Sequence, residues 1–269
     1  MVKKLLKQEM VYYIRSLLPV YLILFGISLV GRCIAFFERD SWVYDTVYGS
    51  AVVVFFISVF VTVSCAVAFS VIRYYKNMFT GEGYLTLTLP VSHEKHIFSK
   101  MLAAVAASVS SFLAVILAFL LFLPGGWMVE VFRAISYLVR ELYQVAGFHL
   151  ILYALELVLF LITNLGLQIL VYYFCISLGQ TFKKNRVLAA VGIYYGFYMI
   201  LQFLSTFLSI VLNNIMENLP MDAILLWIEG NILQLIHGAI LAATGANLLF
   251  ALLFFAVCRY VLKRRLNLE

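Results

Sequence analysis

The chain has 269 residues, of which 65% are hydrophobic and only 12% are charged, and its net charge is +6. A soluble domain is about half apolar and a quarter charged, so this composition excludes a water-soluble fold and predicts an integral membrane protein. The apolar runs are long and continuous, unlike the alternating strands of a membrane barrel. Because lipid cannot satisfy backbone hydrogen bonds, these runs must form helices. We therefore expect an all-α fold with a single transmembrane domain over residues 1–269.

A bilayer core about 30 Å thick needs roughly 20 helical residues. The sequence contains six apolar blocks of sufficient length, which we interpret as membrane spans: Ser16–Phe37, Thr46–Ile72, Ile97–Leu123, Phe148–Leu178, Val187–Leu212 and His237–Leu262. The first block is too long for the apolar core of a signal peptide and lacks a small-residue cleavage site. We expect it to remain as a span.

The 19 Lys and Arg residues are distributed unequally, with fifteen on one side of the predicted spans and four on the other. The larger group occupies the N-terminus, the connections after the second and fourth spans, and the C-terminal tail. Cytoplasmic segments are enriched in Lys and Arg, which predicts a multi-pass protein of the cell membrane with both termini in the cytoplasm. The basic residues then anchor the chain to membrane lipids and do not indicate nucleic-acid binding.

The residues before the first span form an amphipathic pattern. Leu5, Leu6, Met10 and Tyr13 fall near one helical face, and the lysines lie mostly opposite. This pattern predicts a short helix over Val2–Tyr13 in the cytoplasmic interface. A frayed basic tail is the alternative.

The connection Arg73–Lys100 is unusually apolar for a cytoplasmic loop. An apolar segment in this compartment normally rests on the bilayer or on a partner protein. Gly81 and Gly83 allow a sharp entry, and Pro90 sets a stop before the next span. A lone G-x-G is not a nucleotide-binding loop, and the sequence contains no G-x-x-x-x-G-K-S/T. The chain is therefore not expected to bind ATP by that route.

Three features stand within this connection: Glu82-Gly83-Tyr84-Leu85, the later pair Leu89-Pro90, and Lys100 at the start of the third span. Together they resemble the first cytoplasmic loop of ABC-2 type permeases, particularly those of Gram-positive bacteria. In that family an E-x-G-T-L-like segment, a Pro and a downstream Lys connect the second and third spans. The interval from Gly83 to Pro90 is shorter here than in the drug- and polysaccharide-exporter members.

The resemblance implies a permease subunit with partners. Its loop would form a coupling helix that docks on a separate cytoplasmic ABC ATPase through Glu82, Gly83, Tyr84, Leu85, Leu89 and Pro90. Two permease chains, identical or paralogous, would work with an ATPase dimer that binds ATP and Mg. This chain would then be a transport subunit rather than an enzyme, without a cofactor of its own. The first and fifth spans would form the permease–permease interface, where Gly192 and Gly196 supply a G-x-x-x-G pair.

Two segments on the side poor in Lys and Arg are unusual. Gly125–Gly147 interleaves apolar and charged residues in a pattern that predicts an amphipathic helix lying at the outer surface. Asn213–Ile236 contains no Lys or Arg, includes Pro220, and has an apolar stretch too short to span the bilayer. It predicts a re-entrant or lid-like hairpin, and the resembled exporters carry extracellular helices at this place.

Glu156 is the clearest ionisable residue inside a predicted span. Such residues are costly in lipid unless paired or hydrated, and they mark functional sites. With Asn164 and Gln168 deeper in the same helix, Glu156 predicts a polar lining of the substrate path. Alternatively, the helix begins later, Glu156 lies near the headgroups, and the amides form interhelical hydrogen bonds. The four histidines and four cysteines show no metal-binding spacing and predict no metal site.

Three classes of function are compatible with a membrane protein of this kind. The first is the permease subunit of an ATP-driven exporter, with a peptide, an antimicrobial or a lipid-like molecule as substrate. The second is an intramembrane enzyme, which requires polar residues that converge at one depth from two or more helices. The third is a proton- or ion-driven secondary carrier, which favours several buried carboxylates and inverted repeats. The sequence shows neither the converging polar residues of an intramembrane enzyme nor the buried carboxylates and inverted repeats of a secondary carrier.

Overall fold

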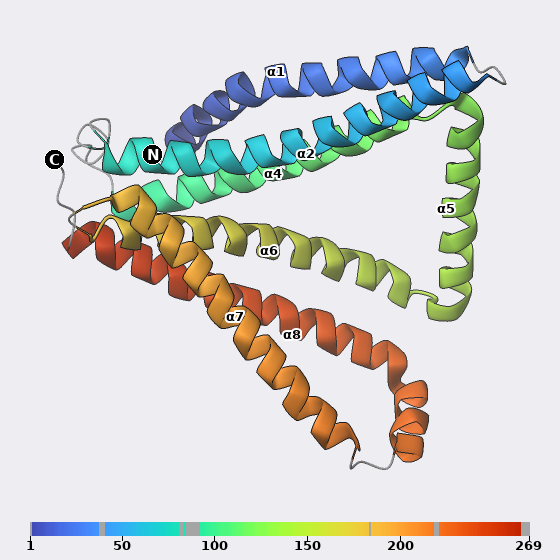
Figure 1. Ribbon diagram of the computed structural model, residues 1–269. Helices are drawn as coiled ribbons and strands as arrows, with labels where there is room; N and C mark the ends of the chain where they lie inside the picture. Colours follow the sequence, from blue (N-terminus) through green and yellow to red (C-terminus); the bar gives the residue numbers. More distant parts are fainter. Residues whose placement is uncertain are drawn as a thin grey trace. The chain divides into compact units, whose positions relative to one another are not determined.

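The computed structural model describes residues 2–37, 41–80, 83, 92–182, 184–217 and 221–264. Within these ranges the elements are all helices: α1 (Val2–Phe36), α2 (Trp42–Phe79), α4 (His93–Phe122), α5 (Gly125–Ala146), α6 (His149–Gly179), α7 (Arg186–Glu217) and α8 (Met221–Arg264) (Figure 1). All except α5 are long and apolar enough to cross a membrane. The predicted all-α architecture with six helices of spanning length is confirmed for the described part of the chain.

Several helices extend beyond the predicted spans. α2 continues past Ile72 to Phe79, and α4 begins at His93, so both flanks of the Arg73–Lys100 connection are helical. The reason is that the predicted spans end where charged residues begin, whereas charge does not end a helix. No Gly or Pro interrupts the chain between Arg73 and Phe79.

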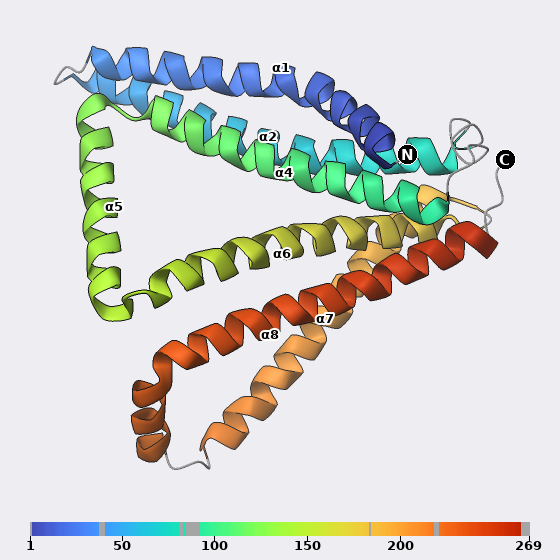
Figure 2. The same ribbon diagram turned by 180° about the vertical axis from the view of Figure 1, so that it is seen from behind.

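The N-terminal segment is helical as predicted, but it is not a separate helix. Residues 2–36 form a single α1 that runs without a break into the first span, so neither the frayed tail nor a distinct interfacial element is found. α1 curves in its first half (Figure 2), and Pro19 lies inside it. A proline inside a helix removes a backbone hydrogen bond and allows bending.

Two segments were predicted on the side poor in Lys and Arg, and only the first forms the separate helix expected of it. Gly125–Gly147 forms α5, whose apolar and charged residues lie on different faces. It ends at Gly147, which has a φ of 55°, a conformation that favours glycine. In Asn213–Ile236 the described residues belong to the flanking helices: α7 reaches Glu217 and α8 begins at Met221, and residues 218–220 lie outside the described part of the chain. The start of α8 bends away from the rest of that helix (Figure 1).

The chain divides into two compact units, Met1–Val145 and Ala146–Glu269. In the first unit, α1, α2 and α4 pack against one another. Its apolar core contains Leu24, Phe55, Ala118 and Phe122, and the rings of Phe55 and Phe122 stack with centroids 4.4 Å apart. Gly31 of α1 makes room for Phe122, because a methyl group at this glycine would overlap the ring.

The small residues of α4 pack inside the first unit. Ala103, Ala107 and Ser111 recur at intervals of four and are all buried. Tyr21 of α1 joins this stripe through a hydrogen bond of 2.7 Å between its hydroxyl and that of Ser111. The stripe therefore brings α1 and α4 together within one chain, as small residues commonly do between membrane helices.

In the second unit, α6 packs against both α7 and α8. The buried residues of α6 all lie between Ile169 and Gly179. There Phe174 contacts Phe254 of α8 with ring centroids 4.8 Å apart, and Gly179 lies against Ala190 of α7. Figures 1 and 2 show α7 crossing α6 and α8 near these ends and diverging from them towards its own C-terminal end.

Within each unit, the helix ends rich in Lys and Arg lie together. Contacts of Glu9 with Arg73 and Lys100 place the start of α1 beside the end of α2 and the start of α4. In the second unit, the end of α6 lies beside the start of α7 and the C-terminal half of α8. This is the arrangement that a charge-oriented membrane protein requires.

Candidate functional site

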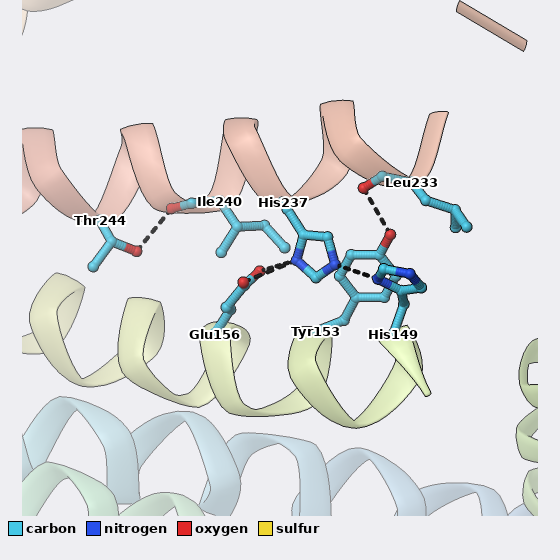
Figure 3. Close-up of polar contacts among 7 residues, drawn as sticks. All are labelled: His149, Tyr153, Glu156, Leu233, His237, Ile240 and Thr244. Atoms are coloured by element: carbon cyan, nitrogen blue, oxygen red, sulfur yellow. Dashed lines mark hydrogen bonds and ion pairs between the residues drawn. The ribbon is translucent and has the colours of Figure 1, made fainter. Parts of the chain in front are cut away.

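A polar cluster joins the start of α6 to the N-terminal half of α8 (Figure 3). The Nδ1 atom of His149 lies 3.0 Å from Nε2 of His237. The Nδ1 atom of His237 lies 2.8 Å from each carboxylate oxygen of Glu156. His237 therefore stands in the middle of a hydrogen-bonded chain, with one neighbour at each ring nitrogen.

Helix geometry explains how α6 supplies three members of this cluster. His149, Tyr153 and Glu156 are separated by four and then three residues, which places them on one face of a helix. The ring of Tyr153 stacks on that of His237 with centroids 4.1 Å apart, and its hydroxyl donates to the carbonyl of Leu233 at 2.8 Å. The orientation of the His237 ring is thus fixed at both nitrogens and on one face.

The three residues of the cluster differ in exposure: His149 is exposed, and Glu156 and His237 are partly buried. The side chains of Glu156 and His237 are 18% and 17% exposed. Imidazole nitrogens and a carboxylate can donate, accept and pass protons. Because both nitrogens of His237 are engaged, the three residues do not converge on a point between them. The described residues contain no group of three His, Cys, Asp or Glu side chains that could hold a metal ion.

The other predicted path residues of α6 do not join this cluster. Gln168 lies twelve residues beyond Glu156, or about 18 Å along the helix, and its side-chain oxygen accepts a 2.9 Å hydrogen bond from Tyr198 of α7. Asn164 lies between them and is half-buried. Glu156 and Gln168 thus connect α6 to two different helices. For Gln168 this is the interhelical hydrogen bond of the alternative interpretation. The later helix start that this alternative required for Glu156 is not found, because α6 begins at His149.

A second polar centre lies in the first unit, at the helix ends rich in Lys and Arg. Glu9 of α1 accepts from Arg73 of α2 at 2.9 Å and from Lys100 of α4 at 2.5 Å. The Lys100 side chain is only 2% exposed. The Arg73 guanidinium also lies over the ring of Tyr12, 4.3 Å from its centroid, a favourable cation–π arrangement. One carboxylate therefore joins three helices.

Most of the predicted coupling segment lies outside the described residues, namely Glu82, Tyr84, Leu85, Leu89 and Pro90. Gly83 is described and buried, and its N–H donates to the carbonyl of Thr80 at 2.7 Å. A methyl group at Gly83 would lie 2.8 Å from the backbone carbonyl of Met78. Close backbone approach therefore favours glycine at this position.

The predicted interface glycines, Gly192 and Gly196, lie on α7 next to open space. A methyl group at either position would have no described atom within 4 Å. Neither glycine is therefore required by packing within this part of the chain. This property distinguishes them from Gly179, where a methyl group would lie 2.6 Å from the side chain of Ala190.

Sequence reasoning missed both polar centres. The spacing of His149 and Glu156 on one face of α6 was visible, but nothing local identified His237, about eighty residues later, as the partner of both. Glu9 was equally visible as a single acid among lysines. Its role depends on which cations the fold brings to it.

The comparisons with known proteins identify no relative. No protein-family model, curated protein or solved structure matches the chain. The assignment of function therefore depends on the sequence pattern and on the geometry described above.

Proposed function

We propose that this chain is the permease subunit of an ATP-driven exporter of the ABC-2 type. It crosses the cell membrane six times with both termini in the cytoplasm. A separate cytoplasmic ABC ATPase dimer binds ATP and Mg and hydrolyses the nucleotide. A second permease chain, identical or paralogous, completes the translocation unit.

The observation that supports this proposal most is the attachment of both loop flanks to α1. Arg73 lies near the end of α2 and Lys100 near the start of α4, and both bind Glu9. A force applied by an ATPase to the intervening segment is therefore transmitted to three helices at once. The segment itself contains the residues that resemble a coupling helix, Glu82 to Leu85 and Leu89 to Pro90.

The exposure of α7 supports the inclusion of a second permease chain. In its most apolar window, only 6% of the residues are buried, and α6 and α8 are similarly exposed with 0% and 11%, compared with 22% in α1 and α2 and 28% in α4. Gly192 and Gly196 face open space, and a G-x-x-x-G pair allows the backbones of two membrane helices to approach closely. We assign this part of α7 to the permease–permease interface.

The substrate class is a peptide, an antimicrobial or a lipid-like molecule. The aromatic content of 16% suits an amphipathic cargo. Glu156, Asn164 and Gln168 provide polar positions at three depths of α6, and we assign them to the translocation path. The hydrogen bonds of Glu156 to α8 and of Gln168 to α7 must then rearrange when substrate passes.

The test is affinity purification of the tagged chain from membranes of the organism that encodes it. We expect an ABC ATPase to co-purify, and mass spectrometry identifies it. Glu82→Ala and Tyr84→Ala should leave the complex assembled but reduce, several-fold, the ratio of ATP hydrolysis in the complex to that of the ATPase alone. Glu141→Ala, on exposed α5, is the control. Purification without any ABC ATPase contradicts the proposed function, and unchanged hydrolysis in both loop variants contradicts the location of the coupling segment.

A second candidate function, a proton-driven carrier, is favoured by one observation. The structure brings Glu156, His237 and His149 together from two helices, whereas the sequence showed Glu156 without an ionisable partner. Intramembrane carboxylate–histidine chains are the groups from which proton relays are built. The two candidate functions differ in the source of energy for export.

A further inference from the structure

The hydrogen bonds around His237 leave room for one additional proton. Among the described residues, each of its ring nitrogens has one hydrogen-bonding partner, the Glu156 carboxylate at 2.8 Å and His149 Nδ1 at 3.0 Å. A carboxylate only accepts, a neutral imidazole donates at one nitrogen and accepts at the other, and an imidazolium donates at both. These rules permit two different proton arrangements with the same positions of the heavy atoms.

We propose that Glu156, His237 and His149 form a proton-binding site that connects α6 to α8. In the form with fewer protons, the His149 Nδ1–H donates to His237 Nε2, and the His237 Nδ1–H donates to Glu156. The cluster then has a net charge of −1. The proposal does not rest on the proposed function, because a proton-binding site of this kind requires neither an ATPase nor a second chain.

Uptake of one proton preserves both hydrogen bonds. A hydronium ion in the surrounding water donates a proton to Nε2 of the exposed His149, and the proton already on His149 Nδ1 passes to His237 Nε2. His237 is then an imidazolium that donates to Glu156 and to His149 Nδ1. The net charge of the cluster becomes zero, and water is the only other product.

Uptake of a second proton breaks the hydrogen bond between His149 and His237. With both rings protonated, an N–H of His149 would face an N–H of His237 across 3.0 Å, where two donors cannot form a hydrogen bond. The contact between His149 and His237 must then open. The site therefore holds α6 and α8 together through the first protonation and loosens them at the second.

The titratable side chains in contact with His237 are consistent with a proton-binding site. Within the described residues, the titratable side chains in contact with it are Glu156, His149 and Tyr153, all from α6. The Tyr153 hydroxyl donates to the carbonyl of Leu233, one helical turn before His237. Opening of the cluster would therefore act directly on the part of α8 that precedes His237.

The test is nitrogen NMR of the full chain, labelled with ¹⁵N in the histidine rings and placed in lipid nanodiscs. Ring nitrogens with and without a proton have distinct chemical shifts. Histidine side chains in general change charge between about pH 5 and 8, so the titration covers this range. His149→Gln and His237→Gln assign the signals, and His93 of the first unit serves as the internal reference. The samples of the main titration contain a chelator. A parallel series contains Zn²⁺ in place of the chelator.

We expect an intermediate plateau at which three of the four ring nitrogens of His149 and His237 carry protons. His149 Nδ1 should be the one without a proton. Glu156→Gln should abolish this plateau, whereas Glu141→Gln on α5 should not change it. If His149 becomes charged before His237, or if the two rings titrate as independent imidazoles in the wild-type chain, the proposal is wrong. Ring shifts that respond to Zn²⁺ rather than to pH also overturn it, and the number of protonated ring nitrogens is counted in the wild-type chain.

Discussion

At the scale of single residues, Glu9 is a buried acid of the first unit. It is an acid in a helix start that otherwise carries lysines, and only 10% of its side chain is exposed. Its two cationic partners come from residues 64 and 91 positions away in the sequence. A buried charge is tolerated only when partners of opposite charge accompany it.

Replacement of Glu9 by Ala should destabilise the first unit. Removing one partner from a buried ion pair typically costs about 3–5 kcal/mol, because the opposite charge remains buried without its counterpart. Glu9→Gln retains an oxygen acceptor and should be less damaging. Unfolding of the detergent-solubilised chain by SDS, followed by circular dichroism, measures the order of stability.

Gln8→Ala is the matched control, because Gln8 is the adjacent residue and is exposed. It should leave the free energy of unfolding within a few tenths of a kcal/mol of the wild type. Equal effects of Glu9→Ala and Gln8→Ala would show that the carboxylate does not hold the three helices together.

What the sequence could reveal at this scale was the helix face but not the partner. His149, Tyr153 and Glu156 share a face by spacing alone, and Glu156 stood out because it is a charge within an apolar run. The partner of Glu156 depends on which turn of α8 lies opposite it, and this is fixed by packing of α6 on α8 around Phe174 and Phe254. The local sequence does not show which turn of α8 lies opposite Glu156.

At the scale of helices, the closest approach of α6 to α7 that the glycines reveal is at Gly179. A methyl group at Gly179 would lie 2.6 Å from the Ala190 side chain and 2.8 Å from its backbone atoms. Backbone cannot yield as a flexible side chain can, so the two helices would have to separate locally.

Gly179→Ala should therefore destabilise the second unit by about 1–3 kcal/mol, the usual cost of an overpacked contact. Gly192→Ala is the control on α7, since the added methyl group meets no described atom within 4 Å. It should be neutral, or stabilising by up to about 1 kcal/mol, because alanine favours helices more than glycine does. SDS unfolding of both variants provides the comparison, and a loss of stability at Gly192 as large as that at Gly179 would contradict it.

Helix positions were more predictable than helix ends. All six predicted spans lie within helices or extend one residue beyond them, because about 20 continuous apolar residues leave little alternative in lipid. The ends were misplaced where polar residues continue a helix, as in α2 from Arg73 to Phe79. Hydropathy reports the thickness of the membrane, whereas a helix ends only where the chain meets a breaking residue or a suitable cap.

At the scale of the whole molecule, the two units differ in how much of their apolar surface they bury. The most apolar window of α6 has none of its residues buried, and those of α7 and α8 have 6% and 11%, while α1, α2 and α4 have 22–28%. Lipid can cover such surfaces, and so can a second membrane chain. The second unit therefore has more surface available for a partner than the first, which agrees with the assignment of α7 to the proposed permease–permease interface.

The source of energy for transport separates the two candidate functions. If the chain is the permease of an ATP-driven exporter, deleting its gene and inactivating the catalytic site of the co-purifying ATPase should remove the same compounds from the culture medium. Untargeted mass spectrometry of the medium detects this loss even when the substrate has not been identified. Replacing the permease by the Glu141→Gln variant is the control and should preserve export. A proton-driven carrier predicts the opposite pattern: export continues when the ATPase is inactive and stops when a protonophore collapses the proton gradient.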